Sequence, residues 1–302
     1  MSEPAAGAVG RAHGKVILLG EHAVVHGAPA LAMAIPSGVL VRAIPAKGDL
    51  SLRVPAWDLD ARTGDGTPSG EALLGLARAI GLDPEGASLV GETRLPPRAG
   101  LGASAAVAAA SARALCSLFG LSPSGKTLFA AVQESEKVFH GNPSGLDASA
   151  ALDGGLLRFT RALGSSPLAA PAPPLVVAHS GSAGDTRAAV SRFAGTLERG
   201  GEEGRDRLER IARLVDEGAG ALARGDLRGF GGIMDENHEH LAWFGVSTPD
   251  LDRLCRTARE AGALGAKLTG GGGGGCAIAL VEAGDDRVAA RLAESGFEVV
   301  IP

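Results

Sequence analysis

The stretch Pro97-Arg-Ala-Gly-Leu-Gly-Ala-Ser-Ala-Ala106 is a glycine-containing loop that leads into a long run of small side chains. Residues 103–118 (ASAAVAAASARALCSL) are dominated by alanine, which favours an α-helix. Backbone N–H groups at a helix N-terminus attract anions, and small residues in the first turn let a phosphate approach them. Ser104 adds a hydroxyl that can bind magnesium. Taken alone, the 97–106 loop predicts either a phosphate-binding loop or a tight turn before a packing helix.

A second glycine-containing segment, residues 120–127 (GLSPSGKT), matches the Walker A pattern. That pattern binds phosphate only when a strand leads into it, whereas here the alanine-rich helix precedes it. We therefore predict a helix–turn–helix connection, with Ser122 as N-cap and Pro123 as the first residue of a helix running to about His140. The relaxed dinucleotide fingerprint at 100–105 is rejected similarly, because two prolines interrupt the approach to it.

Length and composition limit the function classes. The chain has 302 residues, of which 45% are hydrophobic and 21% charged, and its net charge is −5. These values favour one large or two medium globular domains and argue against nucleic-acid or membrane partners. Three widely spaced cysteines and the absence of an apolar leader or a long apolar stretch predict a cytoplasmic protein.

The pattern along the chain predicts two mixed α/β domains, residues 1–170 and 171–302. The proline-rich segment 164–174 (GSSPLAAPAPP) separates them as a predicted linker. Apolar and β-branched runs predict strands at 15–19, 39–44, 51–55, 88–95 and 175–180, with further strands on both sides of the glycines at 270–275 and at the C-terminus. Helices are predicted at 185–199, 205–223 and 226–244, with one more near the C-terminus.

Four segments together resemble the motifs of the GHMP small-molecule kinases. They are residues 14–27 (GKVILLGEHAVVHG), 97–106, 136–147 (EKVFHGNPSGLD) and 267–276 (KLTGGGGGGC). The 136–147 segment is similar to the one that singles out the mevalonate kinases within that superfamily. The resemblance spans nearly the whole chain, with Gly271 standing where the family commonly has alanine.

The resemblance implies a fold and an activity. The fold is α+β, with an N-terminal domain like the second domain of ribosomal protein S5, a C-terminal ferredoxin-like α/β plait, and ATP in the cleft between them. The activity is ATP- and Mg²⁺-dependent phosphorylation of the 5-hydroxyl of (R)-mevalonate to 5-phosphomevalonate. Two alternatives remain, namely a GHMP kinase for another acceptor (a sugar or phosphomevalonate) and an inactive ligand-binding regulator. A homodimer is compatible with the sequence.

The resemblance also implies residue roles, and these make chemical sense for phosphoryl transfer to an alcohol. Asp147 would be the base, and Lys15 beside it would hold its pKa down and stabilise the negative charge that develops on the oxygen. Ser104 and Glu136 would supply oxygen ligands to magnesium.

Further residues are implied to bind the nucleotide or the acceptor. The nucleotide residues are Pro97, Gly100, Leu101, Gly102, Ala103, Ser104, Ala105 and Trp57. The acceptor residues are Glu21, His22, Asp147, Thr186, Arg187 and Gly272. For Trp57, stacking on adenine and burial in the core both stay open. For Thr186 and Arg187, pairing with a carboxylate and capping of the following helix both stay open.

The glycine run, residues 270–275, has apolar strands on both sides. Six consecutive glycines lose much conformational entropy on folding, which is tolerable where backbone presses against a ligand or another backbone. We expect this run to pack against the active site or the 97–106 loop. His238 and His240 are two residues apart and diverge on a helix, so we interpret them as structural.

Overall fold

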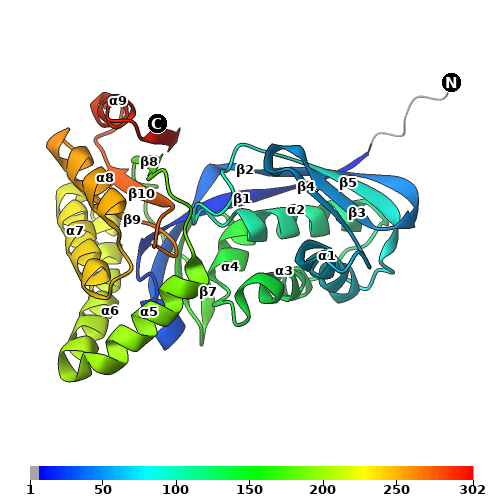
Figure 1. The fold of residues 1–302 in the computed structure, drawn as a ribbon, viewed down its shortest axis with the longest axis horizontal. Coiled ribbons are helices and arrows are strands. Elements are labelled where there is room, and N and C mark those ends of the chain that lie inside the picture. The colour runs from blue at the N-terminus through cyan, green and yellow to red at the C-terminus, as the bar shows by residue number, and fades with distance from the viewer. Residues whose placement is uncertain (1–6, 302) are drawn as a thin grey trace. The chain divides into compact units, whose positions relative to one another are not determined.

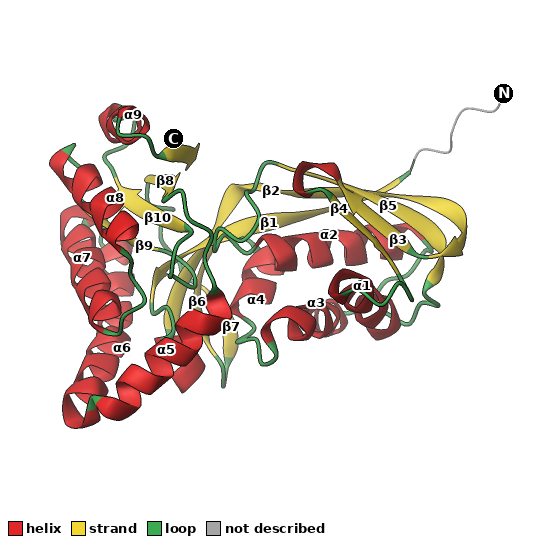
Figure 2. Ribbon diagram, viewed as in Figure 1, coloured by secondary structure: helices red, strands yellow, loops and turns green. Residues whose placement is uncertain are grey.

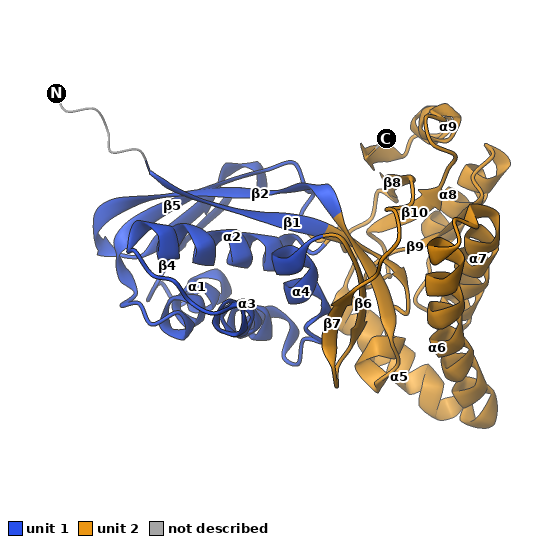
Figure 3. Ribbon diagram, turned by 180° about the vertical axis from the view of Figure 1, so that it is seen from behind, with its two compact units in different colours: residues 1–14, 35–97, 102–154 blue, residues 15–34, 98–101, 155–302 orange. Residues whose placement is uncertain are grey.

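The computed structural model describes residues 7–301, which group into two compact units (Figure 3). The chain passes between the units several times. Unit 1 takes in the residues up to Gly14, Ile35–Pro97 and Gly102–Gly154, and unit 2 takes in Lys15–Ala34, Arg98–Leu101 and the residues from Gly155 onward. The predicted domain boundary near residue 170 stays a prediction. The two compact units are a different division, because each consists of several separate segments of the chain.

Unit 1 is built on an antiparallel-rich sheet with helices on one face (Figure 2). Its strands belong to a path ordered β4-β3-β5-β2, and β1 pairs with β2. The strands are β1 (Ala8–Leu19), β2 (Ala30–Asp49), β3 (Ser51–Val54), β4 (Leu59–Arg62) and β5 (Glu85–Thr93), and the first two continue into unit 2. Side chains along a strand point alternately to the two faces of the sheet. In β5, Ala87, Leu89 and Gly91 are buried on one face, while the residues between them are not buried.

Four helices cover the inner face of this sheet (Figure 1). They are α1 (Pro68–Ala79), α2 (Ala103–Leu118), α3 (Gly125–His140) and α4 (Leu146–Asp153). The predicted helix 103–118 is confirmed, as is the helix–turn–helix connection at 120–127. The predicted cap is wrong, because α3 begins at Gly125 and Ser124 Oγ accepts the Thr127 N–H at 3.1 Å. Ser122 and Pro123 lie in the preceding turn.

Unit 2 contains a four-stranded antiparallel sheet with the order β11-β8-β10-β9. Counted along the chain this order is 4-1-3-2, which is that of the expected ferredoxin-like plait. Its strands are β8 (Leu175–His179), β9 (Gly265–Leu268), β10 (Cys276–Leu280) and β11 (Glu298–Ile301). The helices of unit 2 are α5 (Thr186–Arg199), α6 (Gly201–Ala223), α7 (Leu227–Trp243), α8 (Pro249–Glu260) and α9 (Arg287–Glu294). The α+β class is confirmed.

The predicted linker at 164–174 is partly wrong. Its first residues form β7 (Gly164–Pro167), which pairs with β6 (Leu156–Thr160) in an antiparallel hairpin. β6 in turn pairs with Ala30–Met33 at the start of β2. Strand pairing therefore extends to Pro167, and only the residues after it lack regular structure before β8. Among residues 7–301, no helix combines the length and the apolar character that a membrane span needs.

Candidate active site

In unit 1, the N-terminus of α2 has no side-chain cap. Gly102 is the N-cap in the left-handed conformation (φ 69°), which favours glycine, and no side chain caps the helix. The first intrahelical bond of the turn runs from Ala106 N–H to Gly102 O at 3.0 Å. The N–H groups of Ala103, Ser104 and Ala105 thus lack intrahelical acceptors, as at any helix start. Ala103 and Ser104 are only half-buried. This geometry suits a phosphate.

Two carboxylates lie on helices that pack against α2 within unit 1. Glu136 on α3 is 2% exposed, and its Oε2 lies 3.6 Å from His140 Nε2. Asp147 is half-buried in the first turn of α4, which starts after Gly145 in the left-handed conformation (φ 95°). α2, α3 and α4 contact one another, so one helix layer carries Ser104, Glu136 and Asp147.

The donor chemistry of this layer fits a magnesium ion. Ser104 offers a hydroxyl and Glu136 a carboxylate, which are hard oxygen ligands. Magnesium keeps several waters and binds phosphate oxygens besides one or two protein ligands, so a pair of such residues suits it better than a closed cage does.

Trp57 lies on the short 3₁₀ helix η2 (Pro55–Trp57) and is half-buried. Its Nε1–H donates to Leu95 O at 2.8 Å, which anchors the indole to the chain just before the 97–106 loop. Neither of its two interpretations is decided by this contact, and adenine stacking stays a prediction.

In unit 2, Lys15 on β1 binds the other part of the 97–106 loop. Its Nζ donates to Gly100 O at 2.9 Å, and its backbone N–H donates to Leu101 O at 2.9 Å. The side chain is only 3% exposed. The first strand therefore holds the loop residues 100 and 101 through both backbone and ammonium.

Glu21 forms an ion pair with Lys267, the first residue of the KLTG sequence, and both side chains are fully buried. Lys267 Nζ also donates to Leu268 O at 2.7 Å. Burial raises the pKa of the Glu21 carboxyl and lowers the pKa of the Lys267 ammonium, because each charge leaves water. The role of Glu21 at the acceptor stays a prediction. The Lys267 partnership was missed.

His22 fixes the loop after β1 to the glycine run. Its φ is 59° with ψ −46°, a positive-φ conformation that is uncommon for a residue other than glycine, and its ring stacks on Phe193 with centroids 5.2 Å apart. Nε2 lies 2.8 Å from Gly271 O, and a carbonyl only accepts, so Nε2 carries the proton. Burial lowers the pKa of His22 to about 4, which keeps the ring neutral near pH 7.

Two N–H groups of the glycine run bind acceptors within unit 2. Gly273 N–H donates to Val246 O at 2.8 Å, and Gly275 N–H donates to Ser182 O at 2.7 Å. A Cβ on Gly270 would lie 2.6 Å from Gly100 O. The expectation that the run packs against the 97–106 loop is confirmed.

The departure at Gly271 has a physical reason. A Cβ at this position would lie 2.5 Å from Thr186 Oγ1, so glycine lets the first residue of α5 approach the run. Asp185 is the cap of α5, since its Oδ1 accepts the Ala188 N–H at 3.0 Å. Arg187 is exposed one residue further on. Capping therefore belongs to Asp185, and acceptor binding by Thr186, Arg187 and Gly272 stays a prediction.

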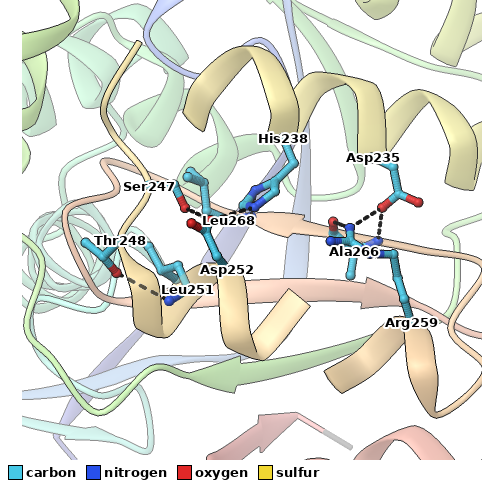
Figure 4. Close-up of polar contacts among 9 residues, drawn as sticks. All are labelled: Asp235, His238, Ser247, Thr248, Leu251, Asp252, Arg259, Ala266 and Leu268. Atoms are coloured by element: carbon cyan, nitrogen blue, oxygen red, sulfur yellow. Dashed lines mark hydrogen bonds and ion pairs between the residues drawn. The ribbon is translucent and has the colours of Figure 1, made fainter. Parts of the chain in front are cut away.

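Polar side chains of α7 and α8 form hydrogen bonds with the backbone of β9 and with one another (Figure 4). His238 Nδ1 accepts the Leu268 N–H at 3.2 Å, and its Nε2 lies 3.1 Å from Asp252 Oδ1 on α8. One turn away, Asp235 accepts the Ala266 N–H at 2.9 Å and pairs with Arg259. The structural interpretation of His238 is confirmed.

Asn237, between these two residues, was missed by the sequence analysis as a contributor. It is fully buried, and its Oδ1 accepts the Gly20 N–H at 3.3 Å. α7 thus orients β9 and the start of the Glu21–His22 loop together. In the sequence, an asparagine at the start of the NHEH segment, residues 237–240, could have pointed to this contact.

Comparison with known proteins agrees with this geometry. Models of the GHMP kinase N-terminal domain and of the GHMP kinase C-terminal region match residues 70–155 and 219–298. The mevalonate kinase of Aeropyrum pernix is 32% identical, covering 96% of this chain and 91% of its own. Those of Thermococcus sibiricus (34%; 93% and 91%) and Homo sapiens (31%; 90% and 85%) are similar.

Solved structures extend the similarity to three dimensions. L. major mevalonate kinase in complex with R-mevalonate has a TM-score of 0.81 at 29% identity, covering 97% of this chain and 94% of its own. Lactococcus lactis galactokinase with galactose reaches a TM-score of 0.78 at 20% identity, covering 97% and 92%. The fold is therefore shared by kinases that act on different alcohols.

Proposed function

This chain belongs to the mevalonate kinases of the GHMP kinase family, and on that premise we propose that it phosphorylates the 5-hydroxyl of (R)-mevalonate with ATP. The observation that carries the proposal is the uncapped first turn of α2, which contains Ser104 and lies in the same helix layer as Glu136 and Asp147. Transfer of a phosphoryl group to an alcohol needs this set of functions: a phosphate cradle, oxygen ligands for a cation, and a proton acceptor.

Asp147 accepts the hydroxyl proton, and its half-exposed place at the start of α4 leaves it accessible to an acceptor. Lys15 stabilises the negative charge that develops on the attacking oxygen. Ser104 and Glu136 would hold magnesium, which when bound neutralises charge on the phosphates. Because Lys15 also donates to Gly100 O, its ammonium is oriented by the 97–106 loop itself.

The 97–106 loop and the first turn of α2 bind the phosphates through backbone N–H groups, which is the role proposed for Pro97, Gly100, Leu101, Gly102, Ala103, Ser104 and Ala105. Trp57 flanks the adenine. On the acceptor side, the exposed guanidinium of Arg187 pairs with the carboxylate of mevalonate. Glu21, His22, Thr186 and Gly272 shape the acceptor site around it.

The substrate is tested by measuring ADP release with a panel of acceptors: mevalonate, phosphomevalonate, homoserine and galactose. We expect kcat/KM for mevalonate to exceed the others by at least about 10². Phosphomevalonate lacks the free 5-hydroxyl and galactose lacks the carboxylate, while homoserine has a shorter chain that places its hydroxyl differently and brings an ammonium into the site. Faster turnover of another acceptor would identify a different GHMP kinase. Nucleotide binding without turnover of any acceptor would identify a ligand-binding regulator.

Two further proposals concern the protein as a whole. We propose a cytoplasmic location, which the cysteine pattern of the sequence favours, and a homodimer, with which the sequence is compatible. Light scattering on the purified chain tests the second, and a monomeric mass at micromolar concentration would contradict it.

A further inference from the structure

A hollow of about 650 Å³ opens on unit 1, and none of the residues assigned above to nucleotide or acceptor lines it. Its walls come from β1, from β2 and from the end of β5. The residues that bear on its chemistry are Arg11, His13, Ser37, Gly38, Glu92 and Arg94. A volume of this size falls within the range of small-molecule sites.

The strand register places cations on both sides of a glycine. Val39 pairs with Thr93 and Leu40 with Glu92, so Gly38 and Arg94 are the residues next to the last pair of these antiparallel strands. On its other side, a Cβ on Gly38 would lie 2.2 Å from Ala12 O, which puts β1 directly alongside. Neighbouring strands are about 4.8 Å apart, so β1 and β5 stand roughly 10 Å apart across Gly38.

Alternation along the flanking strands exposes the charged groups. Arg11 and His13 are exposed, while Ala12 between them is 6% exposed. Arg94 is exposed next to the buried Leu95. Long side chains from two strands can therefore meet above a middle strand that has no side chain at Gly38.

The charge of the hollow is positive in a chain whose net charge is −5. Its one carboxylate, Glu92, pairs with Arg42 outside the hollow at 3.3 Å. Within residues 7–301, neither Arg11 nor Arg94 forms an ion pair with a carboxylate, although the arginines of α6 such as Arg207 and Arg210 do. The guanidinium geometry suits bidentate binding of phosphate or carboxylate groups.

We infer that this hollow binds a small anion carrying two or more phosphate or carboxylate groups, held between Arg11 and Arg94. His13 adds a ring N–H donor, and Ser37 offers a hydroxyl. The site takes up its ligand independently of the proposed phosphoryl transfer, because none of its residues belongs to the proposed catalytic set.

The experiment is calorimetric titration of the full-length chain with pyrophosphate, and separately with citrate, in magnesium-free buffer of low ionic strength. The variant is the double change Arg11→Gln with Arg94→Gln. The control is Arg53→Gln, which removes one positive charge, half of what the double variant loses, from an exposed site on β3 outside the hollow. Comparing pyrophosphate with citrate shows whether the site prefers phosphates or carboxylates.

We expect the double variant to raise the dissociation constant of the preferred anion at least tenfold, because two charge-assisted contacts are lost, and Arg53→Gln to change it less than twofold. Amide resonances of Gly38 and Arg94 should shift on titration. Equal binding by all three proteins would overturn the inference, since the anion would then occupy the 97–106 loop or a general charged surface.

Thermal unfolding checks that each variant is folded. Turnover of mevalonate by the double variant should remain within twofold of wild type, and its loss alone would count against the proposed separation of the two sites.

Discussion

The two glycine-rich loops of this protein use their backbones in opposite ways. Within the 97–106 loop, Gly102 is the N-cap of α2, and no side chain caps the helix. The first N–H groups of α2 therefore have no intrahelical acceptor. In the glycine run, by contrast, two N–H groups are already bound, that of Gly273 to Val246 O and that of Gly275 to Ser182 O. Glycine content alone therefore does not identify a phosphate site. What distinguishes the loops is whether donors remain available.

The charged residues near the two loops also differ in how deeply they are buried. The carboxylate Asp147 near α2 is half-buried, as a group that must reach a substrate should be. Near the glycine run, Glu21 and Lys267 are fully buried against each other. Substitutions on the α2 side should therefore change turnover with little effect on stability, whereas substitutions near the glycine run should change stability first.

The largest expected effect is on turnover, with Asp147→Asn. Removing the proton acceptor should lower kcat by roughly 10²–10⁴ while leaving the KM for ATP nearly unchanged. Steady-state ADP release measures both values. Asp153→Asn, the same change at the other end of α4, is the control and should keep kcat within twofold. A folded Asp147→Asn protein with near-normal kcat would remove Asp147 from the chemistry.

Next comes Lys267→Met, which should cost about 3–5 kcal/mol of the free energy of unfolding. The substitution leaves the Glu21 carboxylate buried without its counter-charge. Urea denaturation measures the change. Adding Glu21→Gln to Lys267→Met should recover part of the loss, because the remaining buried group is then neutral. A loss below about 1 kcal/mol for Lys267→Met would mean that the pair is solvated in solution.

Gly270→Ala tests the contact between the loops. Gly270 has φ 79°, and its new Cβ would meet Gly100 backbone at 2.6 Å, so we expect a loss of about 2 kcal/mol or more. Gly284 has the same φ of 79° with nothing within 4 Å, so Gly284→Ala should show the conformational cost alone, about 1 kcal/mol. Equal losses in the two variants would show that the loops do not press together.

A smaller effect is expected from pH. Burial lowers the pKa of His238 to about 4, despite Asp252 beside it, and Lys267 and Arg259 act in the same direction as burial. Below about pH 6.5 the unfolded chain takes up this proton while the folded protein does not. The free energy of unfolding should therefore fall by about 2 kcal/mol per such histidine between pH 7 and pH 5.

His238→Gln isolates this contribution. Urea denaturation at several pH values should give a shallower pH dependence for the variant than for wild type, although the variant is less stable at pH 7 because it alters the bond to Leu268. Identical slopes would mean that His238 is protonated in the folded protein as readily as in the unfolded one.

Local signals predicted part of the fold. The alanine run gave the bounds of α2, because helix propensity there meets no competing signal. α1 and α8 were missed although each begins with the same readable signal, a threonine cap followed by proline, at Thr67 and Thr248. The α3 cap was misplaced because two serines, Ser122 and Ser124, precede the helix and only the geometry decides between them.

The site was predicted where motifs are continuous and missed where partners are distant. The four motifs named Lys15, Ser104, Glu136 and Asp147 as candidates from their local sequence. The pairing of Glu21 with Lys267 joins residues 246 positions apart, and Asn237 reaches Gly20 across 217 positions. No spacing rule connects such residues, because folding of the intervening chain determines their distance.

The most direct test of the contrast between the loops is amide hydrogen exchange with and without Mg²⁺ and a non-hydrolysable ATP analogue. Without nucleotide, we predict fast exchange at Ala103, Ser104 and Ala105 and slow exchange at Gly273 and Gly275. Nucleotide should slow exchange at the first three at least tenfold and leave the two glycines little changed. Protection that rises at Gly273 and Gly275 while the start of α2 stays fast would contradict the account.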